Sequence, residues 1–384
     1  MSPVPPNVFP TGRLTVDLSA ITDNWRKLAG KAAHGQCAAV VKANAYGLGL
    51  EPICAALSRA GCSEFFVATV GAAVSLRGVL PSATIYCFDG FHPQAEAVYR
   101  RHAITPVINT PEQVAAWCAK PRRGQRAALH VDTGINRLGL TGEQLNWLTA
   151  SPDLMRRLDP ALVISHFACA DEPADPMNDR QLEAFRAAAA HFPTARKSMA
   201  NSAGVFLGRK AHFDLLRPGI ALYGGEAVNN TANPMKPVVR LEGRILQLKS
   251  LPKGSAVGYG ATAKLRRDTQ LAVIGIGYAD GLHRAASGSG TPLRKHRIGA
   301  GACVMIGRHR APILGRVSMD MICVDVSDLP ARGLASLKRQ VIAGEAWADV
   351  INTTLRIDEL AASAGTIGYE ILTSLGHRYE RQYV

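Results

Sequence analysis

The sequence ITPVINTPEQVAAWCAKPRRGQRAALHVD, residues 104–132, contains the pattern that decides the fold. It opens with the short apolar run Ile104–Ile108, continues with a helical pattern over Pro111–Ala119, and closes with a second apolar run, Ala127–Asp132. Short runs rich in β-branched residues predict strands, and a helix between two such runs predicts a parallel β–α–β unit. The stretch therefore predicts two parallel strands joined by a crossover helix.

The same alternation of strand and helix extends over the first 225 residues of the chain. Further helices are expected at Glu51–Ala60 and Asn178–His191, the latter capped by Asp175 or Asn178. Eight β–α units in about 200 residues favour a closed (β/α)₈ TIM-type barrel over an open sheet. The expected strands, in chain order, are Gln36–Lys42, Phe65–Val70, Thr84–Phe88, Ile104–Ile108, Ala127–Asp132, Leu162–Phe167, Lys197–Asn201 and Asp214–Tyr223.

From about Pro237 the pattern changes, because strand-like runs follow one another without helices between them. This texture predicts a second, mainly β domain. The expected organisation is thus an α/β barrel over residues 10–236, followed by a β-rich domain over residues 237–384 that ends in a helical segment. The runs are Val238–Leu251, Gln270–Tyr278, Ala302–Ile306, Ala311–Val317 and Met321–Val326, and the helical segment comprises Arg356–Ala364 and Tyr369–Leu375.

Composition narrows the class of protein. The chain has 384 residues, 47% of them hydrophobic and 19% charged, which is typical of a globular protein rather than a disordered one. The net charge is +14, but the basic residues are scattered, so a solvated surface explains them better than a nucleic-acid interface. No run approaches the roughly 20 apolar residues of a membrane span.

The cysteines and the N-terminus bear on the compartment. None of the eight cysteines forms a C-x-x-C pair, which disfavours a zinc site, and several lie in apolar strand-like runs. Reduced, buried thiols are typical of the cytosol. The first residues contain no apolar signal region. We expect a soluble cytoplasmic protein without a metal centre.

Barrel enzymes carry their chemistry at the carboxyl ends of the strands. The first strand ends at Lys42, where desolvation would lower the pKa of the amine and make it a competent nucleophile. A lysine that merely extends from the barrel rim into solvent is the competing interpretation. Position alone does not separate the two.

The loops after the seventh and eighth strands are rich in small residues, including Ser202, Gly204 and Gly219, with Ile220 following. Barrels commonly bind a phosphate at these loops through backbone N–H groups. Ordinary turn glycines are the alternative. A phosphate cradle combined with a reactive lysine and the nearby Arg217 favours pyridoxal phosphate, attached to the lysine amine.

Nine segments of the chain resemble motifs of the alanine racemase family, and they occur in the order of that family over essentially the whole chain. The segments are V-V-K-A-N-A-Y-G-L-G (Val40–Gly49), D-T-G-I-N-R-L-G (Asp132–Gly139), S-H-F-A (Ser165–Ala168), A-N-S-A-G (Ala200–Gly204), R-P-G-I-A-L-Y-G (Arg217–Gly224), V-G-Y-G-A-T (Val257–Thr262), I-G-Y-A-D-G (Ile276–Gly281), G-R-V-S-M-D (Gly315–Asp320) and G-Y-E (Gly368–Glu370).

The resemblance implies a homodimeric isomerase that uses pyridoxal phosphate to interconvert L- and D-alanine. The sequence leaves open whether the reaction supplies D-alanine for peptidoglycan precursors or serves the breakdown of alanine. Lys42 matches the residue that carries the cofactor and acts as the base on one face of the substrate. Tyr259 matches the base on the opposite face, which the family takes from the other subunit. Arg217 matches the arginine at the pyridine nitrogen, and His166 matches the residue that couples this arginine to the tyrosine.

The remaining matched positions bind the cofactor or the substrate. Tyr278 matches a tyrosine at the entrance of the active site. Phosphate contacts match Tyr46, Ser202, Gly219, Ile220 and Tyr369, and contacts around the substrate carboxylate and amine match Arg137, Met319 and Asp320.

One position departs from the family. Many members have a carbamate-modified lysine, which orients the arginine matching Arg137, where this chain has His130. Histidine cannot form that anion, so Arg137 must be positioned in another way, and we assign His130 no catalytic role. A broad-specificity racemase of the same fold is the alternative function. Decarboxylases with a similar plan place an acidic residue at the pyridine nitrogen, which Arg217 disfavours.

Overall fold

The computed structural model describes residues 9–32, 35–120, 124–293 and 296–384. The chain forms two compact units, and each is described by itself. One unit comprises Ser19–Lys236, and the other joins the residues up to Leu18 with Pro237–Val384.

The first unit is a barrel of parallel strands. Seven pair in chain order, from β3 to β9. The eighth position belongs to β10, which pairs in parallel with β2, while Asp214 N and Arg217 N donate to Lys197 O and Ala200 O beside β9. These bonds close the ring, as the sequence predicts. The strands are β2 (Gln36–Cys37), β3 (Ala39–Val40), β4 (Glu64–Val67), β5 (Thr84–Cys87), β6 (Ile104–Ile108), β7 (Ala128–His130), β8 (Leu162–Ile164), β9 (Arg196–Ser198) and β10 (Leu215–Leu216).

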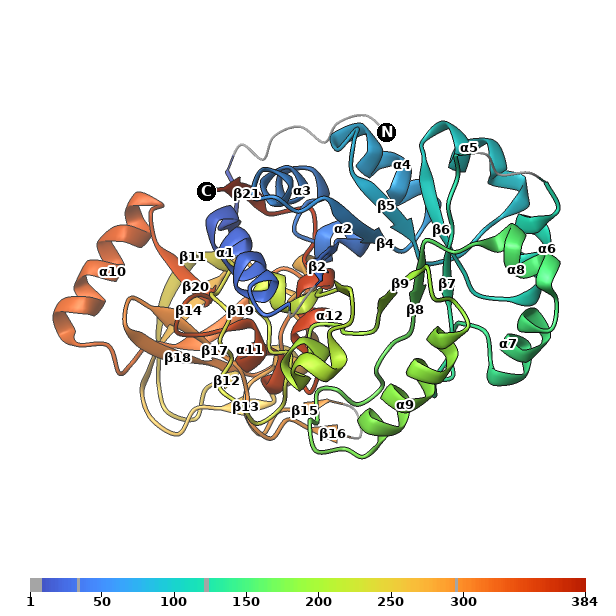
Figure 1. The fold of residues 1–384 in the computed structure, drawn as a ribbon. Helices are drawn as coiled ribbons and strands as arrows, with labels where there is room; N and C mark the ends of the chain where they lie inside the picture. Colours follow the sequence, from blue (N-terminus) through green and yellow to red (C-terminus); the bar gives the residue numbers. More distant parts are fainter. Residues whose placement is uncertain (1–8, 33–34, 121–123, 294–295) are drawn as a thin grey trace. The chain divides into compact units, whose positions relative to one another are not determined.

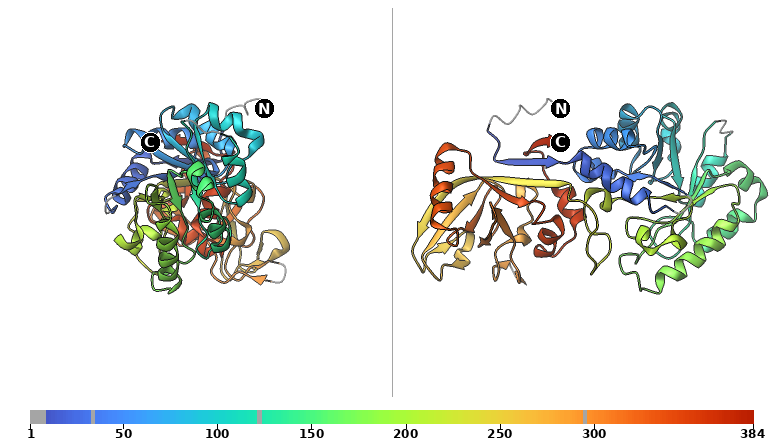
Figure 2. Two further views of the ribbon diagram at one scale, coloured as in Figure 1. Left: turned by 45° about the vertical axis from the view of Figure 1, so that its right-hand side comes forward. Right: turned by 60° about the vertical axis from the view of Figure 1, so that its left-hand side comes forward.

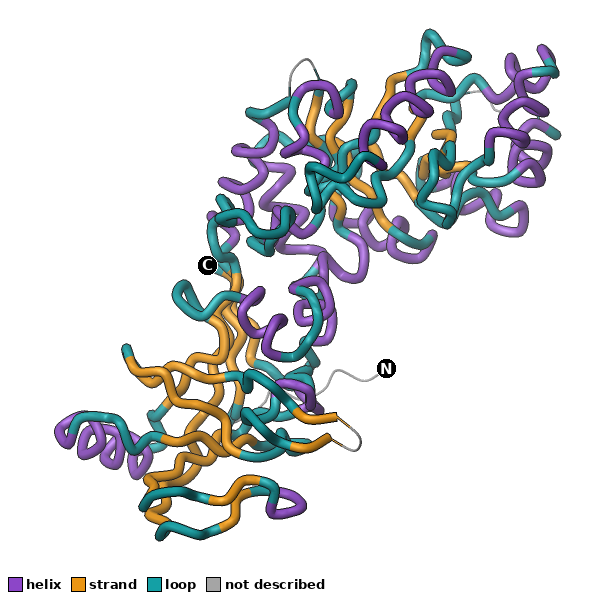
Figure 3. Tube along the Cα trace, turned by 90° about the horizontal axis from the view of Figure 1, so that it is seen from below, coloured by secondary structure: helices purple, strands orange, loops and turns teal. Residues whose placement is uncertain are grey.

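Helices surround the strands of this unit, as Figures 1 and 3 show. Several begin at a residue that caps the first turn: Thr110 Oγ1 accepts the Gln113 N–H at the start of α6, and Thr141 forms a capping box with Gln144 at α7. The helices are α1 (Leu18–Ala29), α2 (Lys42–Tyr46), α3 (Leu50–Arg59), α4 (Val70–Val79), α5 (Glu96–Arg101), α6 (Pro111–Cys118), α7 (Gly142–Thr149), α8 (Pro152–Leu158) and α9 (Met177–Ala190).

Two local predictions differ from the structure in this unit. The eighth strand was expected to reach Tyr223, but β10 ends at Leu216 and residues Ile220–Tyr223 form a 3₁₀ turn, η4. The helix expected to begin near Asn178 begins at Met177, whose N–H donates to Asp175 Oδ1 at 2.8 Å. The apolar residues on both sides of Arg217 favoured one long strand. Pro218 and Gly219 instead turn the chain after β10.

The second unit is built on one eight-stranded sheet with the order β14-β19-β18-β17-β20-β11-β1-β21. The long strand β11 pairs antiparallel with β1, and the two run side by side in the right-hand view of Figure 2. The strands are β1 (Gly12–Val16), β11 (Val239–Leu251), β14 (Thr269–Ile274), β17 (Cys303–Ile306), β18 (His309–Leu314), β19 (Ile322–Asp325), β20 (Trp347–Ile351) and β21 (Glu380–Tyr383).

The expected β domain is therefore present, with additions that the sequence did not predict. Residues 10–18 were assigned to the barrel, but β1 lies in the β unit because all five of its residues pair with β11. Helix α10 (Ala331–Ala343) was also missed, whereas α11 (Ile357–Ser363) and α12 (Gly368–Ser374) match the expected helical segment. No helix of the described residues is long and apolar enough to span a membrane.

Candidate active site

Lys42 directly follows the first strand of the barrel. It is the first residue of α2, and the next four residues have positive φ angles of 52–56°. This left-handed turn ends at Gly47 (φ 82°), and Asn44 Oδ1 accepts the Leu50 N–H at 2.8 Å. Left-handed conformations are unfavourable for residues with a Cβ, and strained backbone of this kind clusters at functional sites.

The electrostatic surroundings of Lys42 favour the neutral amine. Although the residue is exposed, partial burial of its amine lowers its pKa, and the positive charge of Arg137 lowers it further. A lowered pKa increases the fraction of lysine that can act as a nucleophile or base near neutral pH. The predicted reactive lysine and the predicted substrate-binding arginine therefore lie within electrostatic reach of each other.

The loops after β9 and β10 meet at the Ser202 hydroxyl. Ser202 Oγ accepts the N–H groups of Gly219 at 2.8 Å and Ala221 at 3.2 Å. Both lone pairs of this oxygen are thereby used, so its O–H can donate outward. A Cβ at Gly219 would come within 2.1 Å of the Tyr46 hydroxyl, so only glycine allows this approach. Ser202, Gly219, Ile220 and Tyr46 are thus brought together, as predicted from sequence.

Arg217 is a buried cation with neutral partners. Its guanidinium donates to Ser198 Oγ, to Ser165 O at 2.5 Å and to Met199 O at 3.5 Å. Burial lowers its pKa to about 9. The group remains charged at neutral pH and acts as a fixed donor, because a lowered pKa of 9 is still well above 7.

His166 is neutral and its tautomer is determined by its neighbour. Burial and then the charges of Arg217 and Arg137 lower its pKa well below the usual value. The Asn201 amide is oriented by Gly204, whose N–H donates to Oδ1 at 2.8 Å, so Asn201 Nδ2 faces His166 Nε2 at 3.3 Å. His166 Nε2 therefore accepts and Nδ1 carries the proton. The charge of Arg217 contributes to the lowered pKa of His166, and the coupling of Arg217 to Tyr259 through His166 stays a prediction.

His130 presents a second neutral imidazole. Its Nδ1 lies 2.9 Å from Asn109 Oδ1, and the Asn109 amide is oriented by donation to the carbonyls of Phe88 and Val107. The proton must therefore sit on Nδ1. Burial and the charge of Arg217 lower the pKa of His130 to about 4. Its Nε2 is buried and has no hydrogen-bond partner among the described residues.

Arg137 lies on a loop that is tied at both ends. Leu140 N donates to His130 O at 2.8 Å, and Asp132 N donates to Leu140 O at 2.9 Å. Inside the loop, Asp132 Oδ1 accepts the N–H groups of residues 134–136 at 2.9–3.2 Å. The backbone of the loop is fixed, whereas the Arg137 side chain is exposed. His130 thus stands at the base of the loop that carries the predicted carboxylate-binding arginine.

The other predicted site residues belong to the β unit and lie at its surface. Tyr259 is 66% exposed and Met319 is 52% exposed, and Tyr278 and Tyr369 are also exposed. Tyr278 was expected in a strand but opens the 3₁₀ turn η6 (Tyr278–Asp280). Their exposed area leaves these side chains accessible to another molecule.

Asp320, the remaining predicted residue, has a partner that sequence reasoning missed. Arg378 Nη1 donates to Asp320 Oδ1 at 2.7 Å, and the same guanidinium binds Asp280. Asn201 and Asn109 were also missed, although Asn201 lies within a recognised motif. Each of these asparagines is recognised as a site residue because its side-chain amide lies beside a histidine. The spacing of residues along the sequence does not reveal this proximity.

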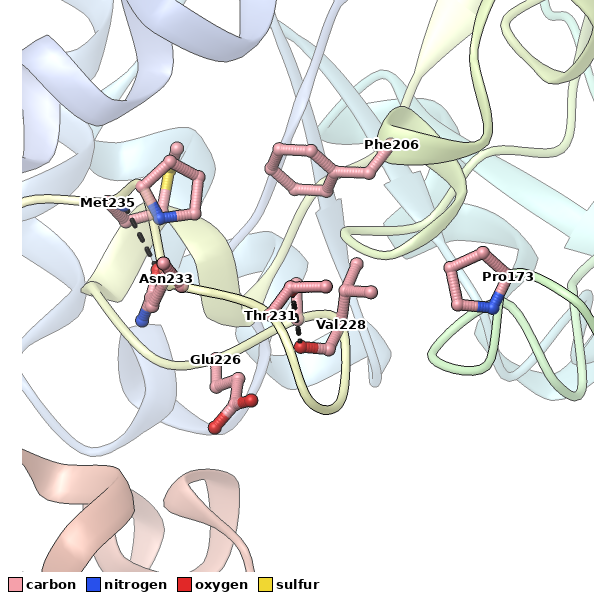
Figure 4. Close-up of a pocket in the computed structure, with 10 residues that line it drawn as sticks. Pro173, Phe206, Glu226, Val228, Thr231, Asn233 and Met235 are labelled. Carbon is pink, nitrogen blue, oxygen red and sulfur yellow. Dashed lines mark hydrogen bonds between the residues drawn. The ribbon is translucent and has the colours of Figure 1, made fainter.

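A pocket of about 300 Å³ in the barrel unit is lined by none of these residues. It is walled by Pro173, Phe206 and residues 226–228 and 231–235. Figure 4 shows the Phe206 ring directed towards this loop, which is held by the hydrogen bonds of Thr231 to Val228 O and of Met235 N to Asn233 Oδ1. Glu226 is the one ionisable side chain among the residues that line this pocket.

The barrel unit combines a partly desolvated lysine amine, a buried arginine and a serine–glycine cradle at the carboxyl ends of its strands. This arrangement is the one expected of barrel enzymes that bind a phosphorylated ligand beside a reactive amine. The model of the alanine racemase N-terminal domain matches residues 16–227, and that of the alanine racemase C-terminal domain matches residues 238–383. The chain therefore belongs to the alanine racemase family.

Relatives agree over nearly the whole length. The chain is 46% identical over 374 residues to the biosynthetic alanine racemase of Agrobacterium fabrum, covering 97% of this chain and 93% of the relative, and 44% identical to the catabolic alanine racemase of the same organism. A solved alanine racemase of Bartonella henselae with covalently bound pyridoxal phosphate is 38% identical, with a TM-score of 0.85 and coverage of 97% and 99%. The biosynthetic enzyme of Pseudomonas aeruginosa has a TM-score of 0.86 at 34% identity and coverage of 98% and 99%.

Proposed function

We propose that this protein interconverts L- and D-alanine with pyridoxal phosphate, using Lys42 and Tyr259 as bases on opposite faces of the substrate. The observation that carries the proposal is the lowered pKa of Lys42 at the end of the first barrel strand, in a chain of this family. Racemisation removes the α-proton from one face and returns a proton to the other. Two bases on opposite faces meet this requirement.

The residues of the barrel unit fit pyridoxal phosphate. Lys42 would hold it covalently, and the Ser202 O–H, with the amides of η4 and the Tyr46 hydroxyl, would receive the phosphate. Arg217 would donate to the pyridine nitrogen, which suits a buried guanidinium that donates to the neutral oxygens of Ser198, Ser165 and Met199. The bound cofactor withdraws electrons from the α-carbon and so makes its proton easier to remove.

The chain's own groups then move the proton. Lys42 Nζ takes it on one face, which the lowered pKa of the amine favours. Tyr259 Oη delivers or takes a proton on the other face. His166, which is neutral and carries its proton on Nδ1, would form a hydrogen bond with this tyrosine. Arg137 would bind the substrate carboxylate. Arg217 stays protonated and acts as a donor only.

We further propose a cytoplasmic homodimer in which Tyr259, Tyr278, Met319 and Asp320 complete the site of the partner subunit. The exposed aromatic and methionine side chains of the β unit support this, because a partner would cover them. All eight cysteines are described, none is in a disulfide and five are buried, which suits a reducing compartment.

The test is incubation of the cofactor-loaded protein with L-alanine in D₂O. Appearance of D-alanine carrying deuterium at the α-carbon is the expected result, with Lys42→Ala as the inactive control. Absence of both racemisation and α-deuterium exchange in the loaded protein would overturn the proposal. Exchange without inversion would retain Lys42 as a base and remove Tyr259 from its assigned role.

A further inference from the structure

Three segments of the β unit that are distant in sequence meet at the predicted substrate residues. They are residues 277–281, which carry Tyr278, residues 318–321, which carry Met319 and Asp320, and residues 374–378 near the C-terminus. The first two are joined by Tyr278 N donating to Ser318 O at 3.0 Å and Ala279 N donating to Met319 O at 2.9 Å. The first and third are joined by Gly376 N donating to Asp280 O at 3.0 Å.

Two glycines permit this close approach. A Cβ at Gly277 would come within 2.4 Å of the backbone oxygens of Ser318 and Met319. A Cβ at Gly281, whose φ is 98°, would come within 2.1 Å of Ser374 O. Both obstacles are backbone atoms and cannot rotate away. The backbone of residues 277–281 is therefore in direct contact with both of the other segments.

Arg378 bridges the three segments with one guanidinium. Its Nε and Nη2 donate to the two carboxylate oxygens of Asp280 at 2.7 and 2.8 Å, and its Nη1 donates to Asp320 Oδ1 at 2.7 Å. Asp280 is 3% exposed, and its Oδ2 also accepts the Gly277 N–H at 2.9 Å. The ion pair with Asp280 is thus bidentate and involves a buried carboxylate, whereas the ion pair with Asp320 involves a half-exposed carboxylate.

From this geometry we propose that Arg378 is a positioning residue for the substrate, one that no sequence motif assigned. The buried Asp280 fixes the guanidinium plane, and the remaining N–H group then holds the Asp320 carboxylate in one direction. Without Arg378, Asp320 rotates freely and its negative charge is no longer balanced beside the place where an amino-acid carboxylate must bind. This inference rests on the proposed function, because it takes Asp320 to be a substrate residue.

The main test is a double-mutant cycle of Arg378→Gln with Asp320→Asn in the loaded enzyme. Arg378→Gln is expected to raise KM for alanine about ten-fold, with a smaller change in kcat. If Arg378 acts through Asp320, adding Arg378→Gln to Asp320→Asn raises KM little further. The proposal would be overturned if the KM increase of the double variant equalled the product of the two single increases, or if Arg378→Gln left KM unchanged.

Two further variants separate positioning from stability. Arg378→Lys keeps the charge but cannot bridge both carboxylates, so it should fold like the wild type and recover only part of the affinity. Arg310→Gln is the matched control, because Arg310 also binds a carboxylate of the same unit, that of Glu359, through both Nη atoms. Its KM should remain at the wild-type value. A ten-fold rise in KM for Arg310→Gln would indicate a general loss of structure and count against Arg378.

A readout independent of activity keeps the inference distinct from the proposed function. Hydrogen exchange measured by mass spectrometry should be faster in Arg378→Gln than in Arg310→Gln for peptides covering residues 276–282 and 317–322. Equal exchange in the two variants would refute the bridging role. If the wild-type protein fails to racemise alanine, the proposed function falls, whereas the exchange result still decides whether Arg378 holds the two loops.

Discussion

The two units present their predicted site residues in opposite ways. In the barrel, Ser202, Arg217 and Tyr46 are buried and hydrogen-bonded or packed within the same unit. In the β unit, Tyr259, Tyr278, Met319 and Tyr369 extend into solvent. The predicted site residues of the barrel are thus held in place within their own unit, whereas those of the β unit are exposed to solvent. The contrast agrees with the proposed homodimer, in which folding alone positions the barrel residues and a partner subunit would cover the side chains of the β unit.

Electrostatics reinforce this difference. The barrel half gathers Arg137, Arg217 and Lys42 and keeps the imidazoles of His130 and His166 neutral. A group of cations of this kind is suited to anionic ligands such as a phosphate and a carboxylate. In the β half, Asp280 and Asp320 share one arginine. Under the proposed function, the barrel would supply the positive field and the β unit would supply residues that orient the substrate.

The largest expected effect comes from removing the reactive amine of the barrel half. Lys42→Ala should lower the rate of α-proton exchange by at least about 1,000-fold, because both cofactor attachment and one base are lost. Exchange of the alanine α-proton in D₂O measures it. Lys210→Ala is a control in the same unit, since Lys210 pairs with Asp179 at the surface. Loss of activity in the control, or activity retained in Lys42→Ala, would contradict the assignment.

The second prediction tests whether the exposed half serves another chain. Tyr259→Phe should lower kcat by about 100-fold or more while leaving the barrel half intact. In a shared site, mixing inactive Lys42→Ala and Tyr259→Phe proteins after subunit exchange should restore about a quarter of wild-type activity. Half of the dimers are then mixed, and each mixed dimer has one complete site. No recovery in mixtures shown to contain mixed dimers would place both bases in a single chain.

Sequence predicted the parts of the fold that depend on local pattern. All eight barrel strands begin within three residues of the predicted positions because each is a short apolar run, although several end earlier than predicted, and β11 was found because it is a long apolar run. Strand β1 was assigned to the wrong unit, because its pairing with residues 239–243 is decided by tertiary structure. The left-handed turn after Lys42 was also missed, because Ala43–Ala45 contain no glycine that would indicate positive φ angles.

The site was predicted where motifs lie in one segment and missed where distant segments converge. Ser202, Arg217 and Gly219 were named from motif residues that the structure does bring together. The Arg378 bridge requires three segments to meet, and Arg378 by itself looks like any exposed arginine. The tautomers of His130 and His166 depend on how Asn109 and Asn201 are oriented by other groups. No single stretch of sequence contains that information.

The third prediction concerns acid stability of the barrel half. The pKa of His130 is about 4 in the folded chain and near 6.5 when unfolded. Between these two pH values the unfolded state therefore binds more protons than the folded state. The free energy of unfolding falls by about 3 kcal/mol as the pH falls from 6.5 through 4. His130→Gln should remove this part of the pH dependence, which urea unfolding at several pH values measures. The exposed His309→Gln of the β unit is the control, and parallel pH curves for wild type and His130→Gln would exclude the effect.

The smallest expected effect concerns strain at the turn behind the reactive lysine. Ala43 is exposed and has φ 53° and ψ 50°, so Ala43→Gly should raise the free energy of unfolding by about 1 kcal/mol. Ala115→Gly on an exposed turn of α6 should lower it by about 1 kcal/mol, because helical glycine is unfavourable. Urea denaturation compares the two. Destabilisation by both changes would mean that the turn stores no strain, whereas opposite signs would show that the barrel half holds Lys42 at an energetic cost.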